Sequence, residues 1–424
     1  MTTGMISEHF RKRPPWGIIL LAVTPALTIL LPWDFGPDST TFRAFIRTNM
    51  LGITIVEFIF VIFAMANGFS PFAALRGLPR LALARLAMVS VGTLWTTIFV
   101  AEFPIMAAIG ISKFFAHGLF GLAVAQQIST WTISQRMQIW PAIGLGVVGF
   151  CLLWTVNIVF YNPIDNDWLR LVPSLPHVRW AGLYAFSCFC AGIAFIKVNS
   201  DNKYNWPILA IGIFFGSLGL AIAFWTGTRA AVLAVFIAVS ITVIVVAARR
   251  QVLLLTVASI VIGLTVATTL PIVNPVYGIG RIIGAVLPVI DGADVSSGRI
   301  QIWTEMLEKI SRRPIMGWGI DQFRYSFSEG DFFARHPHNG VMQLIYSSGM
   351  WGVCAAVLML IAFIRAIGSK IDQPYQFAAI AYLVGMTTYG LYDGPFYFTY
   401  PIMIWLVAAA CLTVPVPPRC ASDK

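Results

Sequence analysis

Long apolar segments recur along the whole 424-residue chain, and they limit what it can fold into more than any other feature. Many are about 18 residues or longer, the length that a helix needs to cross a hydrocarbon core of roughly 30 Å. Only helices and closed barrels satisfy their backbone groups inside a bilayer. Charged residues make up 11% of the chain, compared with roughly 25% in soluble domains. We therefore predict an all-α polytopic membrane protein.

The apolar runs predict about twelve transmembrane helices. The first run begins at Trp16 and has no small-residue cleavage site after it, so we expect a span and not a signal peptide. The fourth is the least apolar, because it contains Lys113 and His117. The predicted spans lie near residues 16–33, 48–66, 83–101, 104–131, 139–160, 179–197, 207–225, 229–248, 252–271, 340–364, 376–391 and 397–414.

These spans divide the chain into three parts. Residues 1–271 hold predicted spans one to nine, residues 272–339 form one long loop, and residues 340–424 hold spans ten to twelve with a tail. Lysine and arginine in the other connections fall consistently on one side, which predicts that both termini are cytoplasmic and that the long loop lies on the opposite side of the membrane. This bias and the basic loop account for the net charge of +10 without a nucleic-acid partner.

Cysteine and metal-ligand patterns indicate neither a disulfide framework nor a bound metal. Of the six cysteines, five lie in predicted spans and Cys420 lies in the tail, so the long loop has none. The sequence has no Cys-x-x-Cys, no His-Glu-x-x-His and no clustered carboxylates. It also lacks a glycine-rich phosphate loop after a strand. We expect no metal, no nucleotide and no other cofactor.

An amphipathic helix is predicted inside the long loop, from Arg299 to Arg313. Ser296 or Ser297 is the expected N-cap, and Pro314 ends the helix. A turn should follow at Gly317-Trp318-Gly319. A helix of this kind with an exposed tryptophan suits the surface of a bilayer. Its predicted apolar positions are Ile300, Trp303, Leu307 and Ile310.

Two arginines occupy positions where an anion could bind. Arg299 falls in the first turn of this helix, near unsatisfied N–H groups, although an ion pair with an acid such as Asp294 would explain it equally well. Arg229 begins a span that is otherwise apolar for seventeen residues except for Ser240 and Thr242. A charge at the edge of hydrocarbon costs a few kcal/mol unless it is paired or hydrated. Either Arg229 snorkels to the surface, or its planar fork binds phosphate oxygens.

The long loop ends in Arg335-His336-Pro337-His338-Asn339-Gly340, where a polar segment re-enters the membrane. Asn339 is the expected N-cap of the next helix. The positive end of that helix disfavours an imidazolium, so we expect His338 to stay neutral and able to accept a proton near pH 7. A neutral imidazole beside a bound phosphate fits a general base. The alternative is a structural hydrogen bond, and convergence with the two arginines would decide between them.

Several of these motifs occur in a specific order, and the set resembles the O-antigen ligase and polymerase superfamily over roughly residues 210–365. Spans one to six match only in number and hydrophobicity, and Thr228 stands where a serine is expected. The set comprises Thr-Gly-Thr-Arg at 226–229, Ser-Gly-Arg at 297–299 followed by Trp303, Pro314, Gly317-x-Gly319, and His338-Asn339 with Gly349 and Gly352 beyond.

The resemblance implies a GT-C-like glycosyltransferase of the bacterial inner membrane that acts on its periplasmic face without a metal. The donor would be a glycan linked to undecaprenyl diphosphate, transferred with inversion. By motif, Arg229 and Arg299 would hold the diphosphate and His338 would deprotonate the acceptor hydroxyl. Arg335, His336, Asn339 and Thr228 would be supporting residues.

Two acceptors are consistent with this chemistry. A ligase transfers the glycan to a sugar of the lipid A core, whereas a polymerase transfers it to another lipid-linked repeat. Twelve spans with one dominant loop between spans nine and ten favour the ligase. A twelve-span transporter is the alternative from another class. Many such transporters have two similar halves and a long central connection, but here about ten residues join spans six and seven, and no internal repeat is visible.

Overall fold

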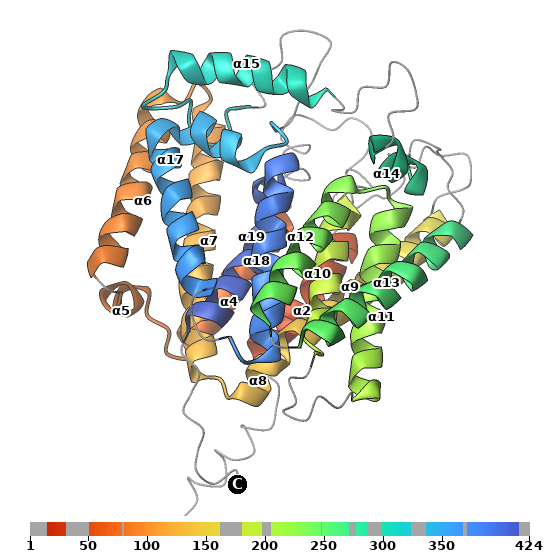
Figure 1. Cartoon of the computed structure of the whole chain (residues 1–424). Helices are drawn as coiled ribbons and strands as arrows, with labels where there is room; N and C mark the ends of the chain where they lie inside the picture. The colour runs from red at the N-terminus through yellow and green to blue at the C-terminus, as the bar shows by residue number, and fades with distance from the viewer. Residues whose placement is uncertain are drawn as a thin grey trace, which may run out of the picture.

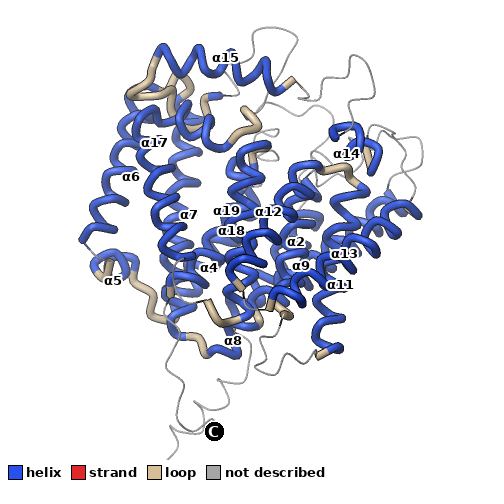
Figure 2. Tube along the Cα trace, viewed as in Figure 1, coloured by secondary structure: helices blue, strands red, loops and turns tan. Residues whose placement is uncertain are grey.

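The computed structural model describes residues 15–30, 51–78, 80–161, 180–196, 205–246, 248–270, 277–286, 298–323, 336–367 and 371–414. All secondary structure within these ranges is helical (Figure 2). The predicted class, an all-α polytopic membrane protein, is confirmed.

Each predicted span coincides with a helix in the described part of the chain (Figure 1). Five of these segments are long and apolar enough to cross a membrane, and six further apolar helices are shorter. The bundle helices are α2 (Trp16–Leu30), α4 (Leu51–Ala66), α6 (Arg80–Val100), α7 (Pro104–Thr130), α9 (Ile139–Tyr161), α10 (Ala181–Ile193), α11 (Trp206–Trp225), α12 (Arg229–Val245), α13 (Arg249–Thr269), α17 (Gly340–Ile367), α18 (Pro374–Tyr392) and α19 (Thr399–Thr413).

Shorter helices complete the described chain. They include α5 (Pro71–Arg76), α8 (Ile133–Met137), α14 (Ile279–Val286) and the 3₁₀ turn η2 (Pro395–Tyr397). The predicted amphipathic helix is α15 (Arg299–Arg312), and it lies across one end of the bundle, far from α8 (Figure 1).

The bundle is packed around α10, α12, α18 and α19, whose inward residues are almost all apolar or small. Helices α10 and α11 approach closely because glycines face each other. A Cβ on Gly192 would lie 2.5 Å from the carbonyl oxygen of Gly212. Small residues allow helices to approach in this way where lipid gives no hydrophobic drive for association. Helices α2, α4, α7 and α9 contribute to the same core as the later helices, whereas α6 packs mainly against α17.

The first and last described helices meet the same end of the bundle. Gly17, near the start of α2, packs against the ring of Trp131. The Arg136 guanidinium donates to the carbonyl oxygens of Trp131 and Val414, the residue after α19. Helix α15 lies at the opposite end (Figure 1). The start of α2 and the end of α19 thus lie at the same end of the bundle, which agrees with an even number of passes of the chain through the bundle between them.

Helix α17 is broken near its start. Gly349 has φ 54° and ψ −134°, which separates a half-helix of residues 340–348 from the long membrane segment. The turn after α15 fills the break, because the N–H groups of Trp318 and Gly319 donate to the carbonyl oxygens of Tyr346 and Ser347 at 2.8 and 2.9 Å. Gly317 and Gly319 both have positive φ, as their predicted turn requires.

A small second core joins α15 to this half-helix. Its buried residues are Ile302, Met306, Phe323 and Tyr346. We refer to α15, residues 313–323 and residues 336–348 together as the cap. Because Ile302 and Met306 face inward, Ile300 and Leu307 are exposed at 65% and 59%. The apolar face predicted for α15 was therefore misplaced around the helix: only Trp303 and Ile310 of that set pack against the small core.

The predicted N-cap was also wrong. Gly298 precedes α15 with φ 77°, and no side chain caps the helix. Ser296 and Ser297, the residues expected there, lie outside the described residues, as does Asp294. A left-handed Gly298 lets the chain turn sharply into α15 without a Cβ clash, so the polar side chains before it are not needed as a cap.

Candidate functional site

The candidate site is built on the short segment that leads into the half-helix. Asn339 caps this helix as predicted, since its Oδ1 accepts the N–H of Met342 at 3.0 Å. Its Nδ2 donates to the carbonyl oxygen of Leu391 at 3.1 Å, which ties the cap to the end of α18. The preceding His338 has φ 52°, a backbone conformation that side chains other than glycine adopt rarely. Strain of this kind clusters at functional sites.

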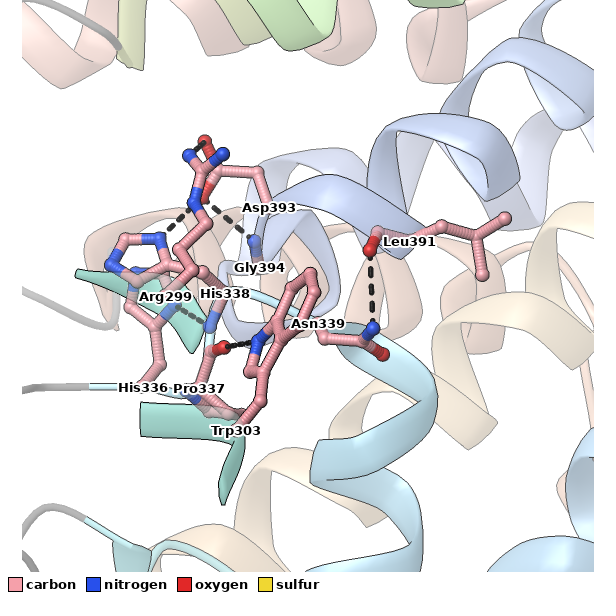
Figure 3. Close-up of polar contacts among 9 residues, drawn as sticks. All are labelled: Arg299, Trp303, His336, Pro337, His338, Asn339, Leu391, Asp393 and Gly394. Carbon is pink, nitrogen blue, oxygen red and sulfur yellow. Dashed lines mark hydrogen bonds and ion pairs between the residues drawn. The ribbon is translucent and has the colours of Figure 1, made fainter. Parts of the chain in front are cut away.

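His338 and Arg299 meet at one carboxylate, that of Asp393 (Figure 3). The Nδ1 of His338 lies 2.8 Å from Oδ1 of Asp393. A guanidinium nitrogen of Arg299 lies 3.9 Å from Oδ2, beyond hydrogen-bond distance, and the Arg299 side chain stays 20% exposed. Its N–H donors are therefore available to an anion that enters the site. Two residues that are far apart in the predicted loop thus meet at one carboxylate.

Asp393 fixes the protonation pattern of the site. Burial acts to raise its pKa, but the hydrogen bond and charge of His338, together with His336 and Arg299, outweigh burial and hold the pKa below its ordinary value. The carboxylate can only accept hydrogen bonds, so the Nδ1 of His338 carries the proton. The Nε2 is left as the proton acceptor in the neutral ring. A carboxylate orients a catalytic histidine in the same way in hydrolases with a Ser-His-Asp triad.

Asp393 is the residue that the sequence reasoning missed. It ends a different span, 55 positions after His338, and has no motif around it. The predicted neutral state of His338 rested on the helix terminus alone. The structure adds a carboxylate oxygen 2.8 Å from the Nδ1 of His338. A lone acid at the outer end of a predicted span was the signal available.

His336 lies behind His338 and is buried, with 7% of its surface exposed. The two rings are 4.1 Å apart between centroids. The Nδ1 of His336 accepts the backbone N–H of His338 at 3.3 Å, so this nitrogen carries no proton. Gly394 leaves room for the His336 ring, because a Cβ there would collide with it. His336 therefore supports the backbone of His338. Arg335, another predicted supporting residue, lies outside the described residues.

Trp303 holds the same segment from the side of α15. Its indole N–H donates to the carbonyl oxygen of Pro337 at 2.8 Å, as Figure 3 shows. The side chain is half-buried, so the prediction of an exposed tryptophan at the bilayer surface was wrong. Arg299 and Trp303 are one helical turn apart on α15. The helix therefore sets the spacing between the guanidinium and the backbone that carries His338.

Arg229 is the first residue of α12, as expected. The turn before Arg229 is packed against α10 on one side and against the residues before α14 on the other. Gly182 of α10 packs against the methyl group of Thr228, and Gly227, with φ 64°, leaves space for the backbone of Gly278 before α14. The hydroxyl groups of Thr226 and Thr228 are 2.8 Å apart, so Thr228 braces the turn. The Thr228 methyl fills space that a serine would leave open.

Arg229 lies at the same end of the bundle as the His338 cluster. The ring centroid of Trp180, the residue that precedes α10, lies 4.2 Å from that of Phe398. Phe398 in turn lies 5.5 Å from His336. This chain of contacts runs from the turn before Arg229 to the cluster. The structure thus brings Arg299 and His338 together directly, and it places Arg229 on the same side of the molecule.

His336, His338 and Asp393 could also hold a metal ion, since their ligand atoms all lie within 4.8 Å of one another. A cation would displace the His338–Asp393 hydrogen bond and sit close to the Arg299 guanidinium, which repels it. The arrangement therefore suits an oriented acid–base pair better than a metal centre. The absence of a metal in the reaction stays a prediction.

Comparison with known protein families agrees with the resemblance found in the motifs. Residues 214–357 match the family model described as O-antigen ligase. This segment contains Arg229, Arg299 and His338, and it ends inside α17. No curated protein matches the chain at a significant level.

Proposed function

We propose that this chain, whose residues 214–357 match the family model described as O-antigen ligase, transfers a glycan from undecaprenyl diphosphate to a sugar of the lipid A core. The observation that carries this proposal is the meeting of Arg299 and His338 at Asp393. It supplies a site for the diphosphate next to a base that is already oriented. The reaction would take place on the periplasmic face of the inner membrane, in the loop predicted at residues 272–339 between the membrane parts 1–271 and 340–424.

In this mechanism the Nε2 of His338 takes the proton of the acceptor hydroxyl. The hydroxyl oxygen attacks the anomeric carbon as the bond from that carbon to the diphosphate breaks, with inversion. The electron pair leaves with the lipid diphosphate. Asp393 stabilises the imidazolium that forms, and a positioned base of this kind contributes about 100- to 10,000-fold.

Arg299 and Arg229 would stabilise the negative charge that grows on the departing diphosphate. Fixed donors aimed at developing charge contribute about 100- to 1000-fold each. Arginine suits this role, since its planar fork binds two phosphate oxygens at once. The diphosphate bond supplies the driving force, so no nucleotide, metal or other cofactor takes part in the proposed reaction.

The glycan products that accumulate in a deletion strain test which acceptor the protein uses. Both a ligase and a polymerase use the same donor, so only a deletion strain separates them. We expect bare lipid A core and full-length polymer retained on the lipid carrier, seen by gel analysis of both pools. Core capped with a single repeat would instead identify a polymerase. Unchanged glycans in both pools would favour a transporter and refute the proposal.

The proposed orientation has its own test. Ser311 is exposed on α15, and Thr130 is exposed at the far end of α7. A cysteine at Ser311, in a background without the native cysteines, should react with an impermeant thiol reagent in cells with a permeabilised outer membrane. A cysteine at Thr130 should react only after lysis. The reverse pattern would place the site in the cytoplasm, where the proposed donor and acceptor do not meet.

A further inference from the structure

Helix α7 carries two ionisable residues one turn apart that the proposed transfer does not use, Lys113 and His117. The His117 Nδ1 lies 2.8 and 2.9 Å from the two carboxylate oxygens of Glu57 on α4, and Glu57 is fully buried. Lys113 is 8% exposed. Charged groups in a membrane helix are costly, and they are rare except where they serve a function. Each of these side chains therefore needs an explanation.

Lys113 is paired with the turn that fills the break in α17. Its ammonium lies 3.4 Å from a carboxylate oxygen of Asp321, and the Asp321 side chain is 4% exposed. Asp321 has φ 56°, another left-handed residue that is not glycine. Two residues earlier, Gly319 donates its N–H to Ser347 of the half-helix. The ion pair therefore anchors to α7 the same turn that holds the half-helix behind His338.

A second line of contacts runs from Lys113 to the site. The ammonium lies 5.4 Å from the centre of the Tyr397 ring, within cation–π distance. The Tyr397 ring lies nearly parallel to that of His336, with centroids 5.4 Å apart. His336 in turn accepts the backbone N–H of His338. Lys113 thus reaches both supports of His338, namely the half-helix and the His336 ring.

We propose that Lys113 is a positioning residue for glycan transfer, which acts through Asp321 and Tyr397 to hold His338 in its left-handed conformation. This inference rests on the proposed function and adds a role for the membrane helix α7. A buried ion pair is no more stabilising than apolar residues of similar volume in many proteins, so the pair is better explained by the geometry it fixes than by stability.

The test replaces both members of the pair together. The double variant Lys113→Met, Asp321→Asn leaves no uncompensated charge, and asparagine tolerates the left-handed backbone at position 321 as aspartate does. The full-length protein should therefore accumulate and keep its melting temperature. With purified lipid-linked donor and lipid A core acceptor in lipid vesicles, kcat should fall about 10- to 100-fold, the loss expected when a catalytic group moves by about 1 Å. The KM for the donor should change little, because Arg229 and Arg299 are intact. The single variant Lys113→Arg keeps the cation and should recover part of kcat.

The Glu57–His117 pair is the matched control, since it lies one turn along the same helix. The double variant Glu57→Gln, His117→Gln should keep kcat near that of the wild type. Equal losses of kcat in both double variants would show a general loosening of α7 and overturn the inference. Wild-type kcat in the Lys113–Asp321 variant would overturn it as well.

Two further measurements keep the outcomes distinct. If the Lys113–Asp321 double variant does not accumulate, Asp321→Asn removes the ion pair at constant volume, and unchanged kcat in that variant overturns the inference. Wild-type protein and His338→Ala are assayed alongside. Transfer by wild type that is lost in His338→Ala upholds the proposed function whatever the Lys113 result. No transfer by wild-type protein contradicts the proposed function itself.

Discussion

The membrane bundle and the cap are held together by different kinds of contact. The bundle has a continuous apolar core, with glycines where helices approach closely, as at Gly192. The small core of the cap has four buried apolar residues. Backbone hydrogen bonds and ion pairs hold the cap in place, and several of its residues have left-handed backbone conformations. Stability should therefore depend mainly on the bundle, and reaction geometry mainly on the cap.

The largest expected effect is that of removing the proposed base. His338→Ala should reduce transfer about 100- to 10,000-fold while donor binding persists. His336→Ala should have a much milder effect, because His336 only supports the backbone of His338. A chelator should leave wild-type transfer unchanged. Transfer that survives in His338→Ala, or that stops with chelator, would contradict the proposed roles.

Substitution of either arginine should have the next largest effect on transfer. Arg299→Ala and Arg229→Ala should each lower kcat about 100- to 1000-fold at near-normal protein abundance. Lysine at either position should recover little, because a point charge cannot reproduce the bidentate fork. The measurement is turnover of the lipid-linked donor by each variant. Full activity in both lysine variants would mean that only positive charge matters, and specific diphosphate coordination would have to be abandoned.

Asp393 should matter less than the groups that contact substrate. Asp393→Asn should lower kcat about 100-fold, since the amide no longer fixes the tautomer of His338 or stabilises its imidazolium. A pKa below the ordinary value means that the carboxylate stabilises the folded protein above that ordinary value, and that this contribution is lost only as the pH falls through the lowered pKa. The difference in melting temperature between wild type and Asp393→Asn should therefore persist down to about pH 5. Its disappearance above that pH would contradict the assigned ionisation.

Substitutions at two glycines test the difference between the bundle and the cap most directly. In Gly349→Ala, a Cβ collides with the backbone of Ile315 at a left-handed position, so the half-helix must shift. We expect transfer to fall about 10- to 100-fold, the loss that follows from a shift of about 1 Å in a catalytic group, with abundance maintained. Gly192→Val instead disrupts the α10–α11 contact and should lower abundance and melting temperature. Equal loss of abundance in both variants would contradict the division between bundle and cap.

The sequence predicted the parts of this structure that depend on local patterns. The lengths of the apolar runs predicted the helices, Pro314 predicted the end of α15, and Asn339 predicted the start of α17. It could not predict Asp393, because no local pattern links the end of one span to a histidine 55 residues away. Periodicity also failed on α15. The helix has apolar residues on more than one face, and its packing against Phe323 and Tyr346, which lie outside the helix, decides that Ile302 is buried.

The smallest predicted effect concerns Trp303, the contact that joins α15 to the backbone of the histidine segment. Trp303→Phe keeps most of the ring and removes the hydrogen bond to Pro337. An intramolecular hydrogen bond contributes about 1 kcal/mol, so kcat should fall about 5-fold. Trp318→Phe is the control for general weakening of the cap, because it loses a similar hydrogen bond, to Lys309, within the same cap. If α15 sets the distance between Arg299 and His338, Trp303→Phe should reduce kcat more than Trp318→Phe at similar melting temperatures. Equal kcat in the two variants would mean that the half-helix alone positions His338, and that α15 contributes only its arginine.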